Sequence, residues 1–130
     1  MTDVTRAPGP TVDKKLILVV DDEFDLAATY EMLFGYYGYA VQVASNGQQA
    51  LELARITPPD VVVSDYMMPV MDGAELLLAW RADPLLRHIP FIMTSAGVAR
   101  ADVDLPFDAF HSKPVRMPLL LDSIRKLTAR

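Results

Sequence analysis

Residues 61–73 read VVVSDYMMPVMDG. The apolar run that opens this stretch has the length and β-branched composition of a buried strand, and it ends at the carboxylate of Asp65. Pro69 and the Asp72-Gly73 pair then indicate a loop, after which the segment 73–82 carries leucines and a tryptophan at helical spacing. A short apolar run, a loop and an amphipathic helix form one strand–helix unit of a parallel sheet.

The same pattern recurs along the chain. Three more apolar runs lead to polar side chains, namely 16–20 to Asp21-Asp22, 91–94 to Ser95, and a short stretch around Phe110 to Lys113-Pro114. A strand is also expected at 40–44, and helices at 23–37, 48–56 and 118–129. Strands that alternate with helices predict an α/β fold, a doubly wound sheet of five parallel strands.

The polar side chains at the strand ends are expected to meet. In an open parallel sheet the ligand crevice lies outside the carboxyl ends of the strands. Asp21, Asp22, Asp65, Ser95 and Lys113 should therefore converge on one crevice. Three carboxylates beside one ammonium are suited to a divalent cation and a phosphoryl group.

Composition narrows the functional classes. The 130 residues carry a net charge of −5, which argues against direct nucleic-acid binding because that needs a basic surface. There is no cysteine and no apolar stretch long enough to span a bilayer, so we expect no disulfide framework and no membrane insertion. Residues 1–13 lack an apolar signal core and predict a flexible tail, residues 14–130 a single domain, and the location is expected to be cytoplasmic.

Three motifs together carry a family resemblance. Val19-Val20-Asp21-Asp22-Glu23, the stretch 64–73, and Lys113-Pro114 resemble the receiver domain of two-component response regulators, from about Lys15 to the C-terminus. The resemblance implies a flavodoxin-like sheet with strand order 2-1-3-4-5. It also implies a stand-alone response regulator that switches or relays a signal after taking a phosphoryl group from a histidine kinase or a histidine phosphotransfer protein, with an unknown downstream protein target.

The resemblance also implies roles for individual residues. Asp65 is expected to be the phosphoacceptor, in a reaction that depends on Mg²⁺. Asp22, Asp65 and the backbone carbonyl of Met67 would ligate the ion, and Asp21 would hold it through water. The peptide bond between Lys113 and Pro114 is expected to be cis, which would direct the lysine side chain into the crevice. Lys113 would pair with Asp65 and later with the phosphoryl group. Ser95 would donate a hydrogen bond to that group, and Phe110 would be the aromatic switch residue coupled to Ser95.

Alternatives stay open at several of these positions. Thr94 also offers a hydroxyl next to Ser95, although the distance of Ser95 from Asp65 fits better. Phe110 is as well explained by core packing as by a switch. The acid pair at 21–22 could simply cap the helix that follows, Asp65 could be a turn residue, and Lys113 could be a surface lysine.

One segment departs from the family pattern. Only 18 positions separate Ser95 from Lys113, which is shorter than the family usually has by about one helical turn (~4 residues). Pro106 further limits a helix there, so the fourth helix is predicted to be short, bent or missing. We expect residues 97–107 to become ordered on phosphorylation.

Two other functions are alternatives to the phosphorylated switch. One is a protein-binding module that keeps the fold but acts without phosphorylation, and the intact acid set argues against it. The other is an enzyme that hydrolyses aspartyl phosphate; it would need an acid two residues after the nucleophile, where Met67 stands. We therefore expect no enzymatic activity beyond the protein's own phosphorylation and dephosphorylation.

Overall fold

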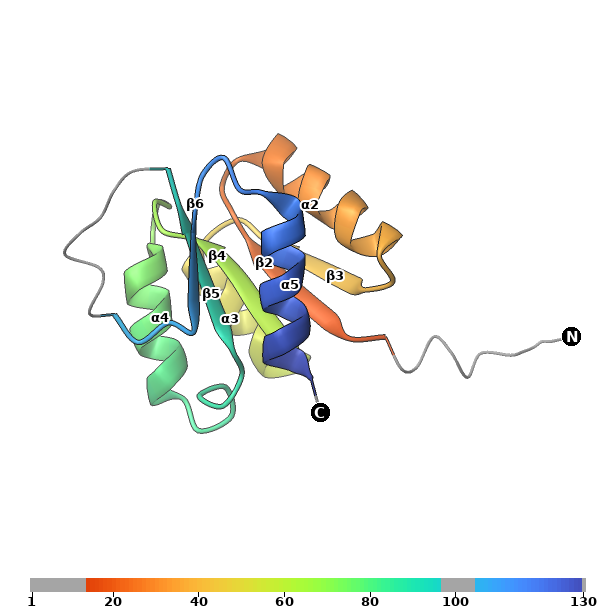
Figure 1. The fold of residues 1–130 in the computed structure, drawn as a ribbon. Coiled ribbons are helices and arrows are strands. Elements are labelled where there is room, and N and C mark those ends of the chain that lie inside the picture. The colour runs from red at the N-terminus through yellow and green to blue at the C-terminus, as the bar shows by residue number, and fades with distance from the viewer. Residues whose placement is uncertain (1–13, 97–104, 130) are drawn as a thin grey trace, which may run out of the picture.

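The computed structural model describes residues 14–96 and 105–129. In these residues five strands alternate with four helices (Figure 1). The strands are β2 (Leu16–Val20), β3 (Ala40–Ala44), β4 (Val61–Asp65), β5 (Phe91–Ser95) and β6 (Ala109–Ser112). The helices are α2 (Phe24–Tyr36), α3 (Gly47–Ile56), α4 (Gly73–Ala82) and α5 (Met117–Thr128). None of these helices is long and apolar enough to cross a membrane.

The strands form one fully parallel sheet in the order β3-β2-β4-β5-β6. Counted along the chain this is the order 2-1-3-4-5, so the predicted doubly wound, flavodoxin-like topology is confirmed. The chain moves outward in one direction from β2 to β3 and then in the other direction from β4 to β6. The strand order therefore reverses between β2 and β4, and a crevice is expected at their carboxyl ends.

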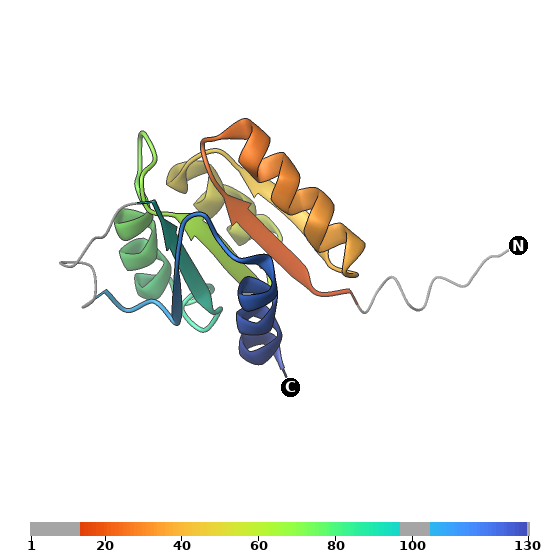
Figure 2. The same cartoon turned by 45° about the horizontal axis from the view of Figure 1, so that its top comes forward.

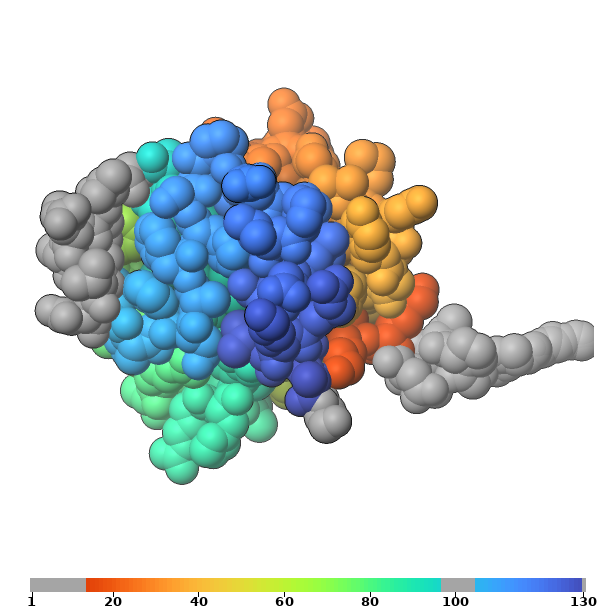
Figure 3. All heavy atoms as spheres, viewed as in Figure 1, coloured from red at the N-terminus to blue at the C-terminus, as the bar shows by residue number. Residues whose placement is uncertain are grey.

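Helices cover both faces of the sheet, and Figure 2 shows the sheet between them. On one face α2 and α5 pack on Ile17, Val19, Val61 and Val63. On the other face α3 and α4 enclose a second apolar cluster that includes the buried Trp80. In the space-filling view the blue residues of β6 and α5 form the middle of the visible face (Figure 3). This burial on both sides explains the apolar runs of β2, β4 and β5.

Local sequence signals set the helix ends. Gly38 follows α2 with a φ of 94°, a left-handed conformation that suits glycine. The Tyr39 N–H donates to the Phe34 carbonyl and the Gly38 N–H to the Gly35 carbonyl, which satisfies the last carbonyls of the helix. Asn46, predicted as part of a turn, caps α3 by accepting a hydrogen bond from the Gln49 N–H at 2.9 Å.

The start of α4 fixes the loop that follows β4. The Asp72 carboxylate accepts from the Glu75 N–H at 2.8 Å, and the Glu75 carboxylate accepts from the Asp72 N–H at 3.0 Å. This reciprocal pair is a capping box. Gly73 packs so tightly that a Cβ there would lie 2.4 Å from the Asp65 carbonyl oxygen. The helix therefore begins directly against the backbone of the predicted phosphoacceptor.

Two predictions lie wholly or largely outside the described residues. The flexible tail was assigned to residues 1–13, which the structure does not describe. The short or missing fourth helix, and the ordering of 97–107, fall mostly on residues 97–104, which are also not described. Within the described part of that segment, residues 105–108 are not helical and lead into β6.

Candidate functional site

The three aspartates meet where the strand order reverses. Asp21 directly follows β2 and Asp65 ends β4, and these strands pair so that Val20 lies opposite Ser64. One carboxylate oxygen from each of Asp21, Asp22 and Asp65 lies within 4.8 Å of the others. The structure thus brings together the acids that the sequence places 44 residues apart. Their oxygens form a set of hard ligands of the kind that Mg²⁺ and Ca²⁺ prefer.

Lys113 reaches the same cluster from the edge of the sheet. Its Nζ lies 3.2 Å from Asp21 Oδ2, 3.3 Å from Asp65 Oδ1 and 3.5 Å from Glu23 Oε1. The predicted cis peptide bond between Lys113 and Pro114 is confirmed. The Lys113 N–H donates to the Ser95 carbonyl at 2.8 Å, which holds the residue at the end of β5. The pairing expected with Asp65 is present, and the structure adds Asp21 and Glu23 as partners.

Asp21 and Asp22 occupy different environments. Asp21 is buried, and its Oδ1 accepts a hydrogen bond from the Glu23 N–H at 2.9 Å. Its backbone N–H donates to the Ala44 carbonyl at 3.0 Å. Asp22 is exposed. The alternative that the pair caps the next helix is not borne out, because the N-cap of α2 is Glu23, whose side chain makes no capping hydrogen bond.

Burial and charge shift the pKa of two groups in the cluster. Burial raises the pKa of Asp65, the nearby Lys113 opposes that shift, and Asp21 adds to it. Burial by itself lowers the pKa of Lys113, but Asp21 and Asp65 together outweigh it and the net shift is upward. The ammonium thus stays charged, and it balances only one of the three carboxylates. The excess negative charge and the oxygen donors fit a divalent cation.

The loop after Asp65 is held at both ends. The Tyr66 N–H donates to the Thr94 carbonyl and the Gly73 N–H donates to the Tyr66 carbonyl, both at 2.8 Å. Between them Val70 has a φ of 69°, which is rare for a β-branched residue. Met67, whose carbonyl is the expected metal ligand, has an exposed side chain. The loop thus combines firm anchors with local backbone strain beside the acids.

Ser95 and Phe110 lie on neighbouring strands. Ser95 is buried at the end of β5, while the Thr94 hydroxyl points to the Ser64 carbonyl at 3.5 Å. The Thr94 hydroxyl thus has a backbone acceptor, which favours Ser95 as the hydroxyl of the site. Phe110 is half-buried, and its ring centroid lies 5.6 Å from that of Phe107. Phe110 therefore has a core contact, as the packing alternative expected.

Two residues at the site were missed from the sequence. Glu23 approaches Lys113, and its place directly after the acid pair was the available signal. Tyr30 of α2 is buried beside the cluster, where burial raises the pKa of its hydroxyl and the charges of Lys113 and Asp21 also act on it. Within the helix expected at 23–37, nothing in the sequence distinguishes Tyr30 from an ordinary core residue.

Comparison with known proteins gives one consistent result. The family model for the response regulator receiver domain matches residues 17–125. The chain is 30% identical over 116 residues to the polar-differentiation response regulator DivK of Brucella anthropi, covering 86% of this chain and 94% of DivK. It is 35% identical over 117 residues to the response regulator PleD of Caulobacter vibrioides, of which the match covers 26%. A third relative is a probable transcriptional regulator of Cyanophora paradoxa, which is 35% identical over 92% of this chain. The match covers 50% of that relative.

Solved structures agree with the sequence relatives. A response regulator from Chloroflexus aurantiacus superposes with a TM-score of 0.84 at 27% identity, covering 91% of this chain and all of the other. The receiver domain of a histidine kinase from Syntrophus aciditrophicus superposes with a TM-score of 0.83 at 29% identity, covering 88% of this chain and 90% of the other. The likeness thus extends to the whole described sheet.

Proposed function

This chain belongs to the family of response regulator receiver domains, and from that premise we propose that it accepts a phosphoryl group on Asp65 in a Mg²⁺-dependent reaction. The observation that carries the proposal is the contact of one ammonium with two buried carboxylates at the carboxyl ends of β2 and β4. The donor would be a sensor histidine kinase or a histidine phosphotransfer protein. The output would be a change in binding to a downstream protein in the cytoplasm.

Asp65 is the nucleophile in this proposal. A carboxylate is a weak nucleophile, so the site must position it and neutralise charge. One Asp65 oxygen forms a bond to phosphorus while the bond from phosphorus to the donor imidazole nitrogen breaks, and the electron pair of that bond stays on the nitrogen. Burial raises the pKa of Asp65, and the nearby Lys113 opposes that shift and favours the reactive anion.

The donor set fits Mg²⁺. Asp22, Asp65 and the Met67 carbonyl would hold the ion directly, with Asp21 acting through water. Bound there, Mg²⁺ supplies positive charge that neutralises the phosphoryl oxygens. Lys113 moves its ammonium from Asp65 to a phosphoryl oxygen, and the Ser95 hydroxyl donates to another. Phe110 responds to the shift of Ser95 across the β5–β6 pair.

The central test is labelling with a small phosphoryl donor. Acetyl phosphate with Mg²⁺ should add one phosphoryl group, observed as one mass increment on the intact protein. Asp65→Asn should abolish the increment, and Asp60→Asn is a matched control on an aspartate before β4. Unchanged labelling of Asp65→Asn would refute the assignment. A folded wild-type protein that takes up no group from acetyl phosphate or from any purified histidine kinase would favour the phosphorylation-independent binding module.

A further inference from the structure

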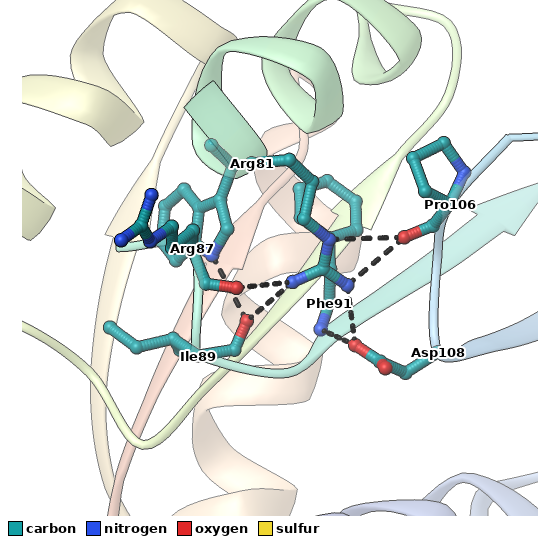
Figure 4. A network of polar contacts seen from close by, with 7 residues as sticks. Arg81, Arg87, Ile89, Phe91, Pro106 and Asp108 are labelled. Atoms are coloured by element: carbon teal, nitrogen blue, oxygen red, sulfur yellow. Dashed lines mark hydrogen bonds and ion pairs between the residues drawn. The ribbon is translucent and has the colours of Figure 1, made fainter. Parts of the chain in front are cut away.

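Arg81, in the last turn of α4, uses all the donors of its guanidinium (Figure 4). A guanidinium has five N–H donors in a fixed planar fork. Nε and Nη2 both donate to the Pro106 carbonyl, at 3.1 and 3.0 Å. Nη1 donates to the carbonyls of Arg87 and Ile89, at 3.0 and 3.2 Å. Nη2 also donates to Asp108 Oδ2 at 2.7 Å, where the two charges form an ion pair.

Asp108 extends this network to the start of β5. The Oδ2 atom that binds Arg81 also accepts a hydrogen bond from the Phe91 N–H at 2.8 Å. The Asp108 N–H in turn donates to the Phe91 carbonyl at 2.9 Å. The end of α4, the start of β5 and the start of β6 are therefore joined by two side chains. We refer to Arg81 and Asp108 with these contacts as the Arg81–Asp108 brace.

The brace lies at the opposite end of β6 from the acids. Among the described residues β6 is an edge strand of four residues that pairs with β5, from Ala109 opposite Ile92 to Ser112 opposite Ser95. Lys113 follows immediately. In a strand this short, a slip of one residue moves every side chain to the other face. The position of Lys113 over the carboxylates thus depends on how the first residues of β6 are held.

Helix α4 connects the two ends of the domain. At its start the capping box of Asp72 holds the loop that follows Asp65, and at its end Arg81 holds the residues before β6. The loop after Asp65 is therefore attached to the start of α4, and the residues that lead into β6 and Lys113 are attached to its end. A change in the attachment at Arg81 would therefore move β6 relative to Asp65.

We infer that Arg81 is a positioning residue for phosphoryl transfer, which sets the register of β6 so that the Lys113 ammonium reaches Asp65. The inference rests on the proposed function of Asp65. Lysine cannot replace Arg81, because one ammonium cannot span the Pro106, Ile89 and Asp108 acceptors that the planar fork reaches. The expected metal ligands lie on or after β2 and β4, outside the brace, so metal affinity should not fall when Arg81 is replaced.

The test is a double-mutant cycle on the rate of phosphorylation. Wild type, Arg81→Gln, Lys113→Ala and the double variant are labelled with acetyl phosphate at saturating Mg²⁺, and Mg²⁺ affinity is measured by calorimetry. Arg81→Gln should slow labelling on the order of 10- to 100-fold, since a misplacement of ~1 Å can have that effect. It should slow the Lys113→Ala protein no further, because both changes remove the same interaction. Its Mg²⁺ affinity should not fall below that of wild type.

Controls separate positioning from general loss of structure. Arg55→Gln removes an arginine of α3 that pairs with Asp83 at 2.8 Å, outside the Arg81–Asp108 brace, and it should label at the wild-type rate. Arg81→Lys should be as slow as Arg81→Gln. If Arg81→Gln does not fold, Asp108→Asn is tested in the same cycle, because it keeps an oxygen for the Phe91 N–H and removes the charge that Arg81 meets.

The outcomes are distinct. The inference would be overturned if the rate losses of Arg81→Gln and Lys113→Ala multiply in the double variant, or if Arg81→Lys labels at the wild-type rate. It would also be overturned if Arg55→Gln slows labelling as much as Arg81→Gln, or if Arg81→Gln loses Mg²⁺ affinity to the same extent as it loses rate. Wild-type labelling of Arg81→Gln would also overturn it while leaving the proposed function intact. Absence of labelling in the wild type would refute the proposed function, and this inference with it.

Discussion

The substitution Gly73→Ala should destabilise the protein although alanine is the better helix former. An added Cβ would lie 2.4 Å from the Asp65 carbonyl oxygen and 2.8 Å from the Tyr66 Cα. Both contacts are backbone, and no rotamer change can relieve them. Insertion of a methyl group into a packed site costs about 1–3 kcal/mol, against a gain of at most ~1 kcal/mol from helix propensity. Because the contact is tight, the cost should exceed the gain, and the free energy of unfolding should fall by about 2 kcal/mol.

Gly35→Ala is the matched control. Gly35 lies in α2 with no atom within 4 Å of an added Cβ, so only the propensity remains and the variant should gain up to ~1 kcal/mol. Urea unfolding followed by the fluorescence of Trp80, the single tryptophan and a fully buried one, measures both variants. A Gly73→Ala protein as stable as wild type would refute the reasoning, and so would equal changes in the two variants. Gly73→Ala should also slow phosphorylation, because it displaces the backbone of Asp65.

Three further predictions follow from the site and its surroundings. Val70→Asn should stabilise the protein by about 1 kcal/mol in urea unfolding, because asparagine tolerates the left-handed φ of 69° that a β-branched residue resists; a loss of stability would contradict the strain. Asp22→Ala should weaken Mg²⁺ binding strongly and Asp21→Ala less, and equal calorimetric titrations of wild type and Asp22→Ala would refute the ligand role. Burial lowers the pKa of His111, whose ring nitrogen lies 2.9 Å from the Ser123 hydroxyl. As the pH falls, the unfolded chain therefore takes up a proton on this histidine before the folded protein does. The contribution of His111 to the free energy of unfolding is complete above about pH 6.5 and decreases as the pH drops below it. His111→Gln should flatten this part of the pH profile of stability.

The sheet and the acid cluster could be predicted because each polar residue ends an apolar run. In a parallel sheet the ends of separate strands meet at one edge, so the positions of Asp21, Asp65 and Lys113 in the sequence already determine their meeting in space. The helix limits were predicted to within one residue. Gly38 after α2 and Pro118 in the first turn of α5 act through local backbone preferences, which the sequence shows directly.

Other features depended on contacts that leave no signal in the sequence. The partners of Arg81 are mostly backbone carbonyls, which every residue has, so nothing in the letters around Pro106 indicated the network. Lys113 contacts three carboxylates, and these contacts depend on the side-chain conformations of Asp21 and Glu23, which the sequence does not show. The left-handed φ of Val70 could not be predicted, because that conformation is normally marked by glycine or asparagine.

The order of the strands also governs when the site can form during folding. Lys113 and Asp21 touch across a separation of 92 residues, and β6 is the last strand along the chain. Contacts between such distant positions form late, because closing a long loop opposes them until the intervening sheet is in place. A folding intermediate with β2, β3 and β4 paired would already gather the three carboxylates but would lack the ammonium. When β6 pairs with β5, the Lys113 ammonium would reach these acids and reduce the repulsion among them. The charges of the site would thus favour the pairing of the last strand of the sheet.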